Sequence, residues 1–314
     1  MSTDTKKIAT IHIMNFLKNQ SVYMKLLLFL ATMLFVFAIA KPLSSASQEG
    51  FRQKERYVIR KNGKIYDDFY VSLFDMLFQK DELVREELDL LTPVVEFNQE
   101  SHVLDIAAGS GMTLELLKKR NISAIGIDES KAYVDLAKSK FGNLQISVGT
   151  PLKSNTFRPS SFSHILSLYF TIYYIKDKTT LFKNCYDWLM PGGYLVVHLV
   201  NRDKFDPIVP SGNPFLMVSP QKYAAQRITK SKIKLTNFQY DSDFTLNKDK
   251  NMGTFTETFT NDNEGNVRQN VHTLYMDTQR HILSLAKDVG FSLLGKIDLN
   301  IIQYEYNYLY ILKK

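Results

Sequence analysis

Residues 103–112 read VLDIAAGSGM, and residues 124–130, a helix's length further on, read AIGIDES. An apolar run that ends in an acid, a turn of small residues, a helical segment and a second apolar run ending in an acid form the pattern of a nucleotide-binding βαβ unit. The sequence therefore predicts an α/β domain that binds a ligand containing a ribose.

The glycine spacing argues against a dinucleotide as that ligand. A dinucleotide turn needs G-x-G-x-x-G, because the backbone must close on a pyrophosphate at the helix N-terminus. Gly109 and Gly111 fill the first two positions, but Leu114 takes the third, and the turn has no charge to meet a phosphate. The pyrophosphate interpretation therefore fails.

The same residues resemble the class I S-adenosylmethionine-dependent methyltransferases of the small-molecule type. The first motif of that family reads roughly acid-x-Gly-x-Gly-x-Gly, and its second strand ends in an acid for the ribose hydroxyls. Ala107 stands at the family's first glycine, which adds a methyl group near the methionine part of the cofactor. The resemblance implies S-adenosyl-L-methionine as cofactor, with contacts from Tyr66, Asp105, Ala107, Gly109, Ser110, Gly111, Asp128, Glu129, Thr150, Pro151 and Leu168.

Further segments follow in the order of that family. Residues 144–150 predict a third strand that ends at Thr150, where the family commonly has an acid. Residues 162–169 predict a fourth strand, with His164 at a position where aspartate is usual, and residues 188–197 contain the Pro-Gly-Gly turn into a fifth. The resemblance implies a Rossmann-like, seven-stranded class I methyltransferase sheet.

The chain also departs from the minimal domain. Residues 66–91 are apolar at helical spacing and begin with Tyr66, which resembles the family segment that folds over the cofactor; Tyr70 is a second lid candidate, with a core tyrosine as the alternative. Residues 201–275 contain three alternating runs, which predict an antiparallel β insertion, a flap over the carboxyl edge of the sheet. The methyltransferase domain is expected to span residues 66–314.

Methyl transfer from an activated sulfonium needs mainly positioning, with a general base only where the nucleophile is protonated. Tyr169 after the fourth strand, and His198 and Arg202 at the end of the fifth, are the candidate catalytic residues. His198 also fits a histidine that is bonded within the sheet edge, and Arg202 fits a surface loop charge. No metal is expected, because the single cysteine and scattered histidines match no ligand spacing.

The charge of the chain is concentrated near its beginning. Residues 1–65 carry eleven Lys and Arg against three acidic residues, whereas residues 66–314 carry 28 basic and 29 acidic residues. A near-neutral catalytic region offers no basic face for phosphates, so nucleic acid is a disfavoured partner.

An apolar segment lies within the basic part. Residues 26–40 span only about 22 Å as a helix, short of a roughly 30 Å hydrocarbon core, but Lys25 and Lys41 can snorkel at its two ends. We expect an N-terminal tail over residues 1–25, a transmembrane anchor over 26–40 and a basic linker over 41–65. A signal peptide cleaved after Ala40 and a core or interfacial helix are the alternatives.

More positive charge follows the segment than precedes it, which predicts a single-pass membrane protein with a cytosolic catalytic domain. The function expected is a membrane-anchored, S-adenosylmethionine-dependent methyltransferase that acts on a small or lipid-like acceptor. The alternatives are a non-catalytic, membrane-tethered S-adenosylmethionine-binding module, and a methyltransferase that acts on protein or RNA.

Overall fold

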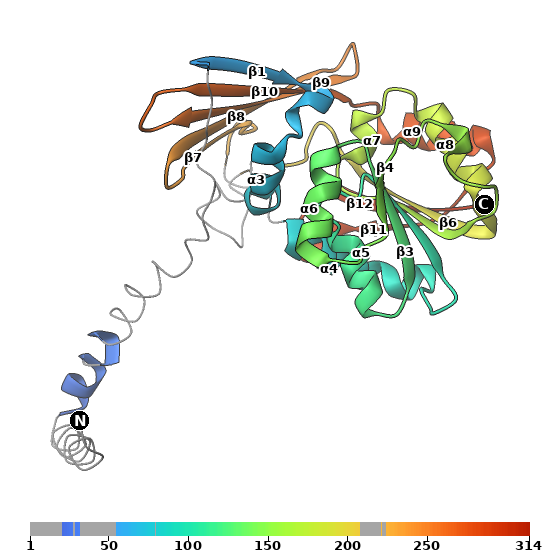
Figure 1. Cartoon of the computed structure of the whole chain (residues 1–314), viewed down its shortest axis with the longest axis horizontal. Coiled ribbons are helices and arrows are strands. Elements are labelled where there is room, and N and C mark those ends of the chain that lie inside the picture. Colours follow the sequence, from blue (N-terminus) through green and yellow to red (C-terminus); the bar gives the residue numbers. More distant parts are fainter. Residues whose placement is uncertain (1–20, 28, 32–54, 79, 208–220, 222–223) are drawn as a thin grey trace. The chain divides into compact units, whose positions relative to one another are not determined.

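A computed structural model describes residues 21–27, 29–31, 55–78, 80–207, 221 and 224–314 (Figure 1). The chain divides into two compact units, Met1–Arg52 and Gln53–Lys314. Every strand discussed below belongs to the second unit.

The first unit corrects the predicted localisation. Residues 22–27 and 29–31 are helical. In the described part of the chain, no helix has both the length and the apolar character needed to cross a membrane. This finding contradicts the predicted single-pass membrane localisation. Residues 32–40 of the predicted anchor, like residues 1–20 and 41–54 of the tail and linker, lie outside the described residues.

Sheet B is the seven-stranded sheet that the motifs predict, in the order β11-β12-β6-β5-β2-β3-β4. The five strands from β6 to β4 are parallel, and β12 runs antiparallel to both of its neighbours. The predicted Rossmann-like fold is therefore confirmed. The strands are β2 (His102–Ile106), β3 (Ser123–Asp128), β4 (Ile146–Val148), β5 (Phe162–Ser167), β6 (Leu189–Val200), β11 (Ser292–Asp298) and β12 (Asn307–Lys313).

Helices cover both faces of sheet B because successive strand residues point to opposite sides. On β6, Leu195 and Val197 pack with residues of α8 and α9, whereas Val196 packs with residues of α4 and α5. The helices are α3 (Asp68–Phe78), α4 (Lys80–Val95), α5 (Met112–Lys119), α6 (Lys131–Phe141), α7 (Thr171–Tyr174), α8 (Lys178–Trp188) and α9 (Gln279–Val289); short 3₁₀ turns are η2 (Asn62–Ile65), η3 (Ser154–Thr156) and η6 (Leu299–Ile302).

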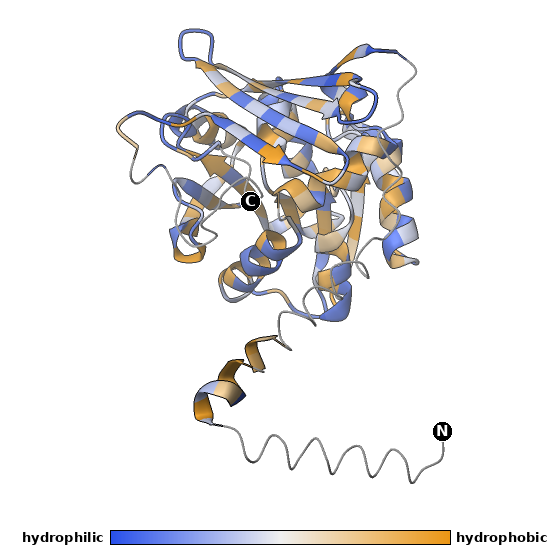
Figure 2. Ribbon diagram, turned by 90° about the vertical axis from the view of Figure 1, so that its left-hand side faces the viewer, coloured by the Kyte–Doolittle hydropathy of each residue, from blue (hydrophilic) through white to orange (hydrophobic). Residues whose placement is uncertain are grey.

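Sheet A is a second, five-stranded sheet in the order β1-β10-β9-β8-β7. Four of its strands come from within residues 201–275 and pair antiparallel. Figure 2 shows hydrophilic and hydrophobic residues alternating along them, as expected of strands with one buried face. The strands are β1 (Tyr57–Lys61), β7 (Lys230–Lys234), β8 (Phe238–Asn247), β9 (Met252–Asn261) and β10 (Val267–Tyr275).

Strand β1 corrects the predicted linker over residues 41–65. Tyr57 to Lys61 pair in parallel with β10, in the register Val58 to Arg268. The strand lies at the edge of sheet A and is mostly exposed, so it has no buried face that would give it an alternating pattern in the sequence.

His164 on β5 has a structural role. Its Nε2 lies 2.7 Å from the Val95 carbonyl oxygen and therefore donates to it, and its Nδ1 lies 2.8 Å from Ser163 Oγ. The buried ring thus ties the end of α4 to sheet B. Burial lowers the pKa of His164 from its usual value, because protonation would place a charge in an apolar setting.

We predict that this histidine makes folding weaken in mild acid. Its folded-state pKa is lowered, so its contribution is complete above the unfolded-state value near 6.5 and is lost as the pH falls below it. In His164→Gln the amide still donates to Val95, and the fall in urea-unfolding free energy between about pH 7.5 and about pH 5.5 should be smaller than in the parent. The control is His102→Gln, at an exposed histidine on β2, for which the fall seen in the parent is expected. An equal fall in His164→Gln and the parent would contradict this account.

Candidate active site

The turn after β2 forces the backbone into conformations that favour glycine. Ala107, Gly109 and Gly111 have φ values of 57°, 56° and 79°. A Cβ at Gly111 would lie 2.7 Å from a Leu144 methyl carbon, so α5 begins in close contact with its neighbours. Ala107 is the only one of the three that carries a Cβ, and it adopts the left-handed conformation at a cost.

Asp128 joins this turn to the end of β3. Its Oδ2 accepts a hydrogen bond from Gly109 N at 2.9 Å, and its Oδ1 accepts one from Ser130 N at 2.8 Å. Gly126 allows the close approach, since a Cβ there would meet Ala108 and Leu114 at 2.8 Å. The two acid-ended motifs of the sequence therefore form one compact structure.

The remaining predicted cofactor residues lie at the same edge of sheet B. Asp105 pairs with Gly126 on β3 and with Leu166 on β5, two residues before Leu168. Gly149 N donates to Asp128 O at 3.0 Å, which places Thr150 beside the β3 turn. Ser110 and Pro151 are buried and Glu129 is exposed. These residues thus follow the carboxyl ends of β2 to β5, where α/β sheets bind ligands.

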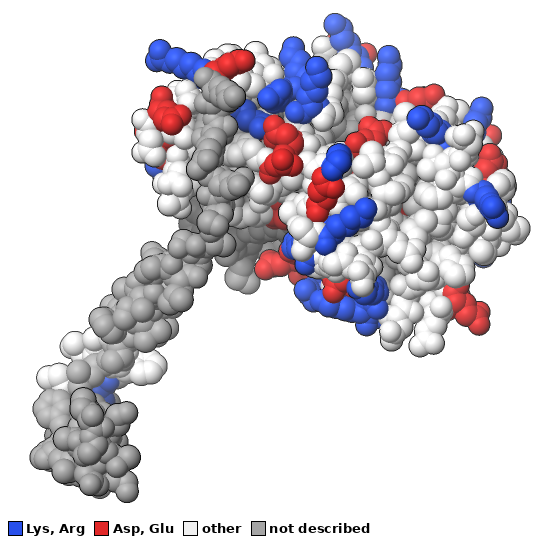
Figure 3. Space-filling model, in the orientation of Figure 1, with Lys and Arg blue, Asp and Glu red and all other residues white. Residues whose placement is uncertain are grey.

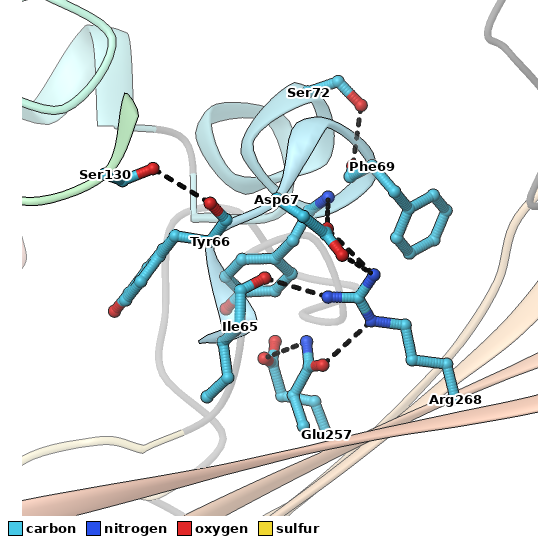
Figure 4. Close-up of polar contacts among 10 residues, drawn as sticks. Ile65, Tyr66, Asp67, Phe69, Ser72, Ser130, Glu257 and Arg268 are labelled. Atoms are coloured by element: carbon cyan, nitrogen blue, oxygen red, sulfur yellow. Dashed lines mark hydrogen bonds and ion pairs between the residues drawn. The ribbon is translucent and has the colours of Figure 1, made fainter. Parts of the chain in front are cut away.

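Tyr66 is held between this edge and sheet A (Figure 4). Ser130 Oγ donates to the Tyr66 carbonyl at 2.9 Å. From the other side, the Arg268 guanidinium donates to Ile65 O at 2.8 Å and to both carboxylate oxygens of Asp67 at 2.8 and 2.9 Å. The segment carrying Tyr66 is therefore fixed to the β3 turn and to β10 at once.

A buried histidine and carboxylate lie beyond Tyr66 on the inner face of sheet A. His272 Nε2 lies 2.7 Å from Glu257 Oε2, and Tyr240 donates to Glu257 Oε1 at 2.8 Å. The Tyr174 hydroxyl lies 2.9 Å from His272 Nδ1 and also hydrogen-bonds Tyr66. Burial raises the pKa of Tyr174 well above its usual range, so its phenol remains protonated.

A cavity of about 60 Å³ opens between these groups. Its wall contains His272 and Tyr174, and most of the rest is aromatic, from α3, from the segments after β5 and β6 and from sheet A: Tyr70, Phe74, Phe78, Tyr169, Phe170, Phe205, Phe244 and Phe255. The space has room for only a few water molecules, so a ring-sized ligand enters only if the lining side chains move apart.

The three predicted catalytic residues have different environments. Tyr169 lines the cavity, with φ of 52°, and hydrogen-bonds Tyr304. His198 is fully buried outside the lining, with Nε2 3.1 Å from Asn307 Oδ1 and Nδ1 3.2 Å from Glu87 Oε1. This placement favours the alternative of a histidine bonded within the sheet.

Arg202 also lies outside the cavity lining. Its guanidinium donates to Met276 O at 2.6 Å and to the Asn251 side chain, so it holds the β8–β9 turn against the end of β10. These contacts favour a structural role for Arg202 over contact with the acceptor.

His272 and Glu257 were not identified from the sequence. The available signal is the alternation in residues 254–260, where threonines take one face of the strand and Phe255, Glu257 and Phe259 take the other. Burying an acid between two phenylalanines on an inward face costs free energy of desolvation, so Glu257 is a candidate functional residue.

The comparisons with known proteins agree with this geometry. Residues 104–197 match the family model described as a methyltransferase domain. The chain is 26% identical over 104 residues to a ubiquinone biosynthesis O-methyltransferase of Coxiella burnetii, a match that covers 32% of this chain and 44% of that protein. It is 26% identical over 139 residues to a phosphoethanolamine N-methyltransferase of Plasmodium falciparum, covering 42% of this chain and 52% of that protein.

Among solved structures, an S-adenosylmethionine-dependent methyltransferase from Clostridium acetobutylicum superimposes with a TM-score of 0.57 at 16% identity, over 78% of this chain and 97% of that one. The chain spans about half the length of the curated relatives it matches. The family match over residues 104–197 agrees with the predicted methyltransferase class, and the superposition shows the fold of an S-adenosylmethionine-dependent methyltransferase.

We predict that Ala107→Gly stabilises the protein. Glycine adopts the left-handed conformation without strain, which outweighs its larger unfolded-state entropy, so the free energy of unfolding should rise by about 0.5–1 kcal/mol. Ala108→Gly is the matched control: Ala108 is buried and packs against β3, and its truncation should lower stability by about 1 kcal/mol. Urea unfolding of the two variants decides the matter; destabilisation of both would show that Ala107 is unstrained.

Proposed function

We propose that this chain, which carries an S-adenosylmethionine-dependent methyltransferase domain, transfers a methyl group to a small acceptor enclosed between the carboxyl edge of sheet B and the inner face of sheet A. The observation that carries the proposal is the aromatic cavity with one polar wall. Its Tyr174 hydrogen-bonds Tyr66, whose carbonyl is bonded by Ser130 in the turn after β3. Ring faces and a few convergent polar groups are typical of small-molecule sites.

The residues at the edge of sheet B fit the cofactor. In this proposal the Asp128 carboxylate binds the ribose hydroxyls in addition to its two backbone amides, since a carboxylate has about four acceptor positions. The Gly109–Gly111 backbone approaches the methionine part, and Thr150 and Pro151 lie beside the adenine. Tyr66, which packs against Tyr133 of α6 at 5.6 Å between ring centroids, covers the cofactor from the sheet A side.

The reaction asks little more of the protein than position and a dry environment. The bound cofactor supplies a methyl group that its sulfonium already activates. The chain's own residues orient the acceptor in line with that methyl and exclude water, which the aromatic lining favours. Ring faces such as those of Tyr70 and Tyr169 also favour a nearby positive charge.

Enclosure and charge both favour a small acceptor over a macromolecule. A nucleic acid or a folded protein needs an open surface, whereas the lining rings come from several segments, far apart in the sequence, that surround the cavity. On the face shown in Figure 3, Lys and Arg are interspersed with Asp and Glu, so no broad field attracts a polyanion. The names of the two curated relatives also refer to small acceptors.

Calorimetry on the full-length chain tests the cofactor part of the proposal. S-adenosylmethionine and S-adenosylhomocysteine should bind and NAD should not. Asp128→Asn should weaken binding by about 1.5–3 kcal/mol, because an amide replaces an acceptor of two ribose hydrogen bonds. The control is Asp135→Asn, an exposed partner of Lys131 on α6. Equal heats with NAD, or an unaltered affinity in Asp128→Asn, would refute the assignment.

A product screen tests the acceptor part. The full-length chain and S-adenosylmethionine are offered phenols, amines, RNA and unfolded protein, and release of S-adenosylhomocysteine is followed. Turnover is expected with small molecules alone. Salt-dependent methylation of RNA would exclude the enclosed-acceptor proposal, and binding of the cofactor without turnover of any acceptor would leave a binding module.

A further inference from the structure

Glu257, His272 and Tyr174 form a buried chain of polar groups that the methyltransferase motif does not account for. On the basis of the function proposed above, we propose that this chain is a proton relay: Tyr174 contacts the acceptor and receives its proton, while His272 and Glu257 act behind Tyr174. The acceptor class that follows is an aromatic compound with a ring hydroxyl.

The geometry fixes the direction of the relay. Glu257 Oε2 lies 2.7 Å from His272 Nε2, so the carboxylate holds the imidazole proton on that nitrogen. Nδ1 is then an acceptor, and the Tyr174 hydroxyl 2.9 Å away donates to it. Both Tyr174 and His272 line the cavity. The hydrogen bonds therefore run from the cavity wall towards Glu257.

The carboxylate at the far end is held in place on its other side. Tyr240 donates to Glu257 Oε1 at 2.8 Å, and Asn270 Nδ2 lies 3.4 Å from Oε2. Arg268 Nε in turn donates to Asn270 Oδ1 at 2.9 Å. Glu257 thus keeps a fixed orientation towards the imidazole, which is the requirement for a group that positions a base.

Packing alone gives no reason for such a chain. Removing a carboxylate and an imidazole from water costs several kcal/mol per ion, and apolar residues of similar volume would serve the sheet at least as well. The neighbouring inward positions on β9 are in fact Phe255 and Phe259. Glu87 and His198 also form a buried pair, but they lie outside the cavity lining. The position of His272 and Tyr174 in the cavity wall is therefore what distinguishes the proposed relay from that pair.

The proton and electron changes balance with the groups present. As the carbon–oxygen bond to the acceptor forms, the carbon–sulfur bond of the donor breaks and its electron pair stays on sulfur. The acceptor hydroxyl gives its proton to the Tyr174 oxygen, and Tyr174 gives its own to His272 Nδ1. The imidazolium that results is paired with Glu257 and returns its proton to solvent after the product leaves.

The acceptor class follows from this route and from the lining. A hydroxyl is a poor nucleophile until it loses its proton, so it gains most from a relay. The rings around the cavity, among them Phe74, Phe170 and Phe255, favour an aromatic partner for stacking. A ring hydroxyl satisfies both conditions.

The test uses 4-nitrophenol, whose visible absorption band belongs to the phenolate alone. The full-length chain saturated with S-adenosylhomocysteine is titrated with this probe across neutral pH. The relay should favour the bound phenolate, so the ionisation constant of the bound probe should rise by about tenfold over the free value. The groups facing His272 that enter this profile are Glu257 from β9, Tyr70 from α3, Tyr174 from α7 and Tyr66.

Three variants separate a relay from a structural role. Tyr174→Phe and His272→Gln should each abolish the rise in the ionisation constant, and Glu257→Gln should reduce it, whereas His281→Gln, at an exposed histidine on α9, should leave it unchanged. Thermal melting checks that each variant is folded. If the substitutions of the buried His272 and Glu257 prevent folding, Tyr174→Phe still tests the relay, because it removes only one hydroxyl.

Failure to bind the probe, or a rise that persists in folded Tyr174→Phe or His272→Gln, would overturn the relay. Binding of S-adenosylhomocysteine is measured in the same samples. Its presence without the spectral change refutes the relay and leaves the proposed function standing, whereas its absence refutes the proposed function itself.

Discussion

The carboxylate of Asp128 is the contact on which the rest of the site depends. It accepts backbone hydrogen bonds from Gly109 and Ser130 and thereby holds together the turns that follow β2 and β3. From Ser130 the connection continues through the Tyr66 carbonyl, and from the adjacent Asp67 through Arg268 and Asn270 to Glu257 (Figure 4). One series of backbone and side-chain contacts therefore links the cofactor turn of sheet B to the inner face of sheet A.

Strain and buried charge both occur at or near this connection. Ala107 and Tyr169, after β2 and β5, have positive φ values although neither is glycine. Glu257, His272 and Arg268 are buried, and each has a polar partner within 3 Å. Such features cost free energy and persist only where the surroundings determine them strongly, which is typical of functional sites. The hydrophobic clusters on the two faces of sheet B consist of aliphatic and aromatic side chains, and the buried Glu87–His198 pair is a separate polar contact.

The sequence predicts the cofactor half of this arrangement because its signals are local. An acid-ended strand, a glycine turn and the next acid-ended strand lie within residues 103–130, and each is recognisable alone. The acceptor half is not local. The edge strand β1 pairs with β10 more than two hundred positions away, and the cavity draws residues from α3, the segment after β5 and sheet A. Propensity and periodicity carry no information about such contacts, so the sequence predicts a linker at β1 and does not distinguish His272 from other strand residues. The sequence predicts the positions of His198 in β6 and Arg202 just after it, but the direction of their side chains depends on Asn307 and Met276, which are distant in the chain.

The central claim is that the cofactor at the edge of sheet B presents its methyl group to the cavity under sheet A. A crystal structure of the chain with S-adenosyl-L-methionine tests it most directly. The account predicts the ribose hydroxyls on Asp128, Tyr66 over the cofactor, and the sulfonium methyl group pointing towards Tyr169 and Tyr174. A methyl group that faces away from these tyrosines, or a cofactor bound without Asp128, would contradict it.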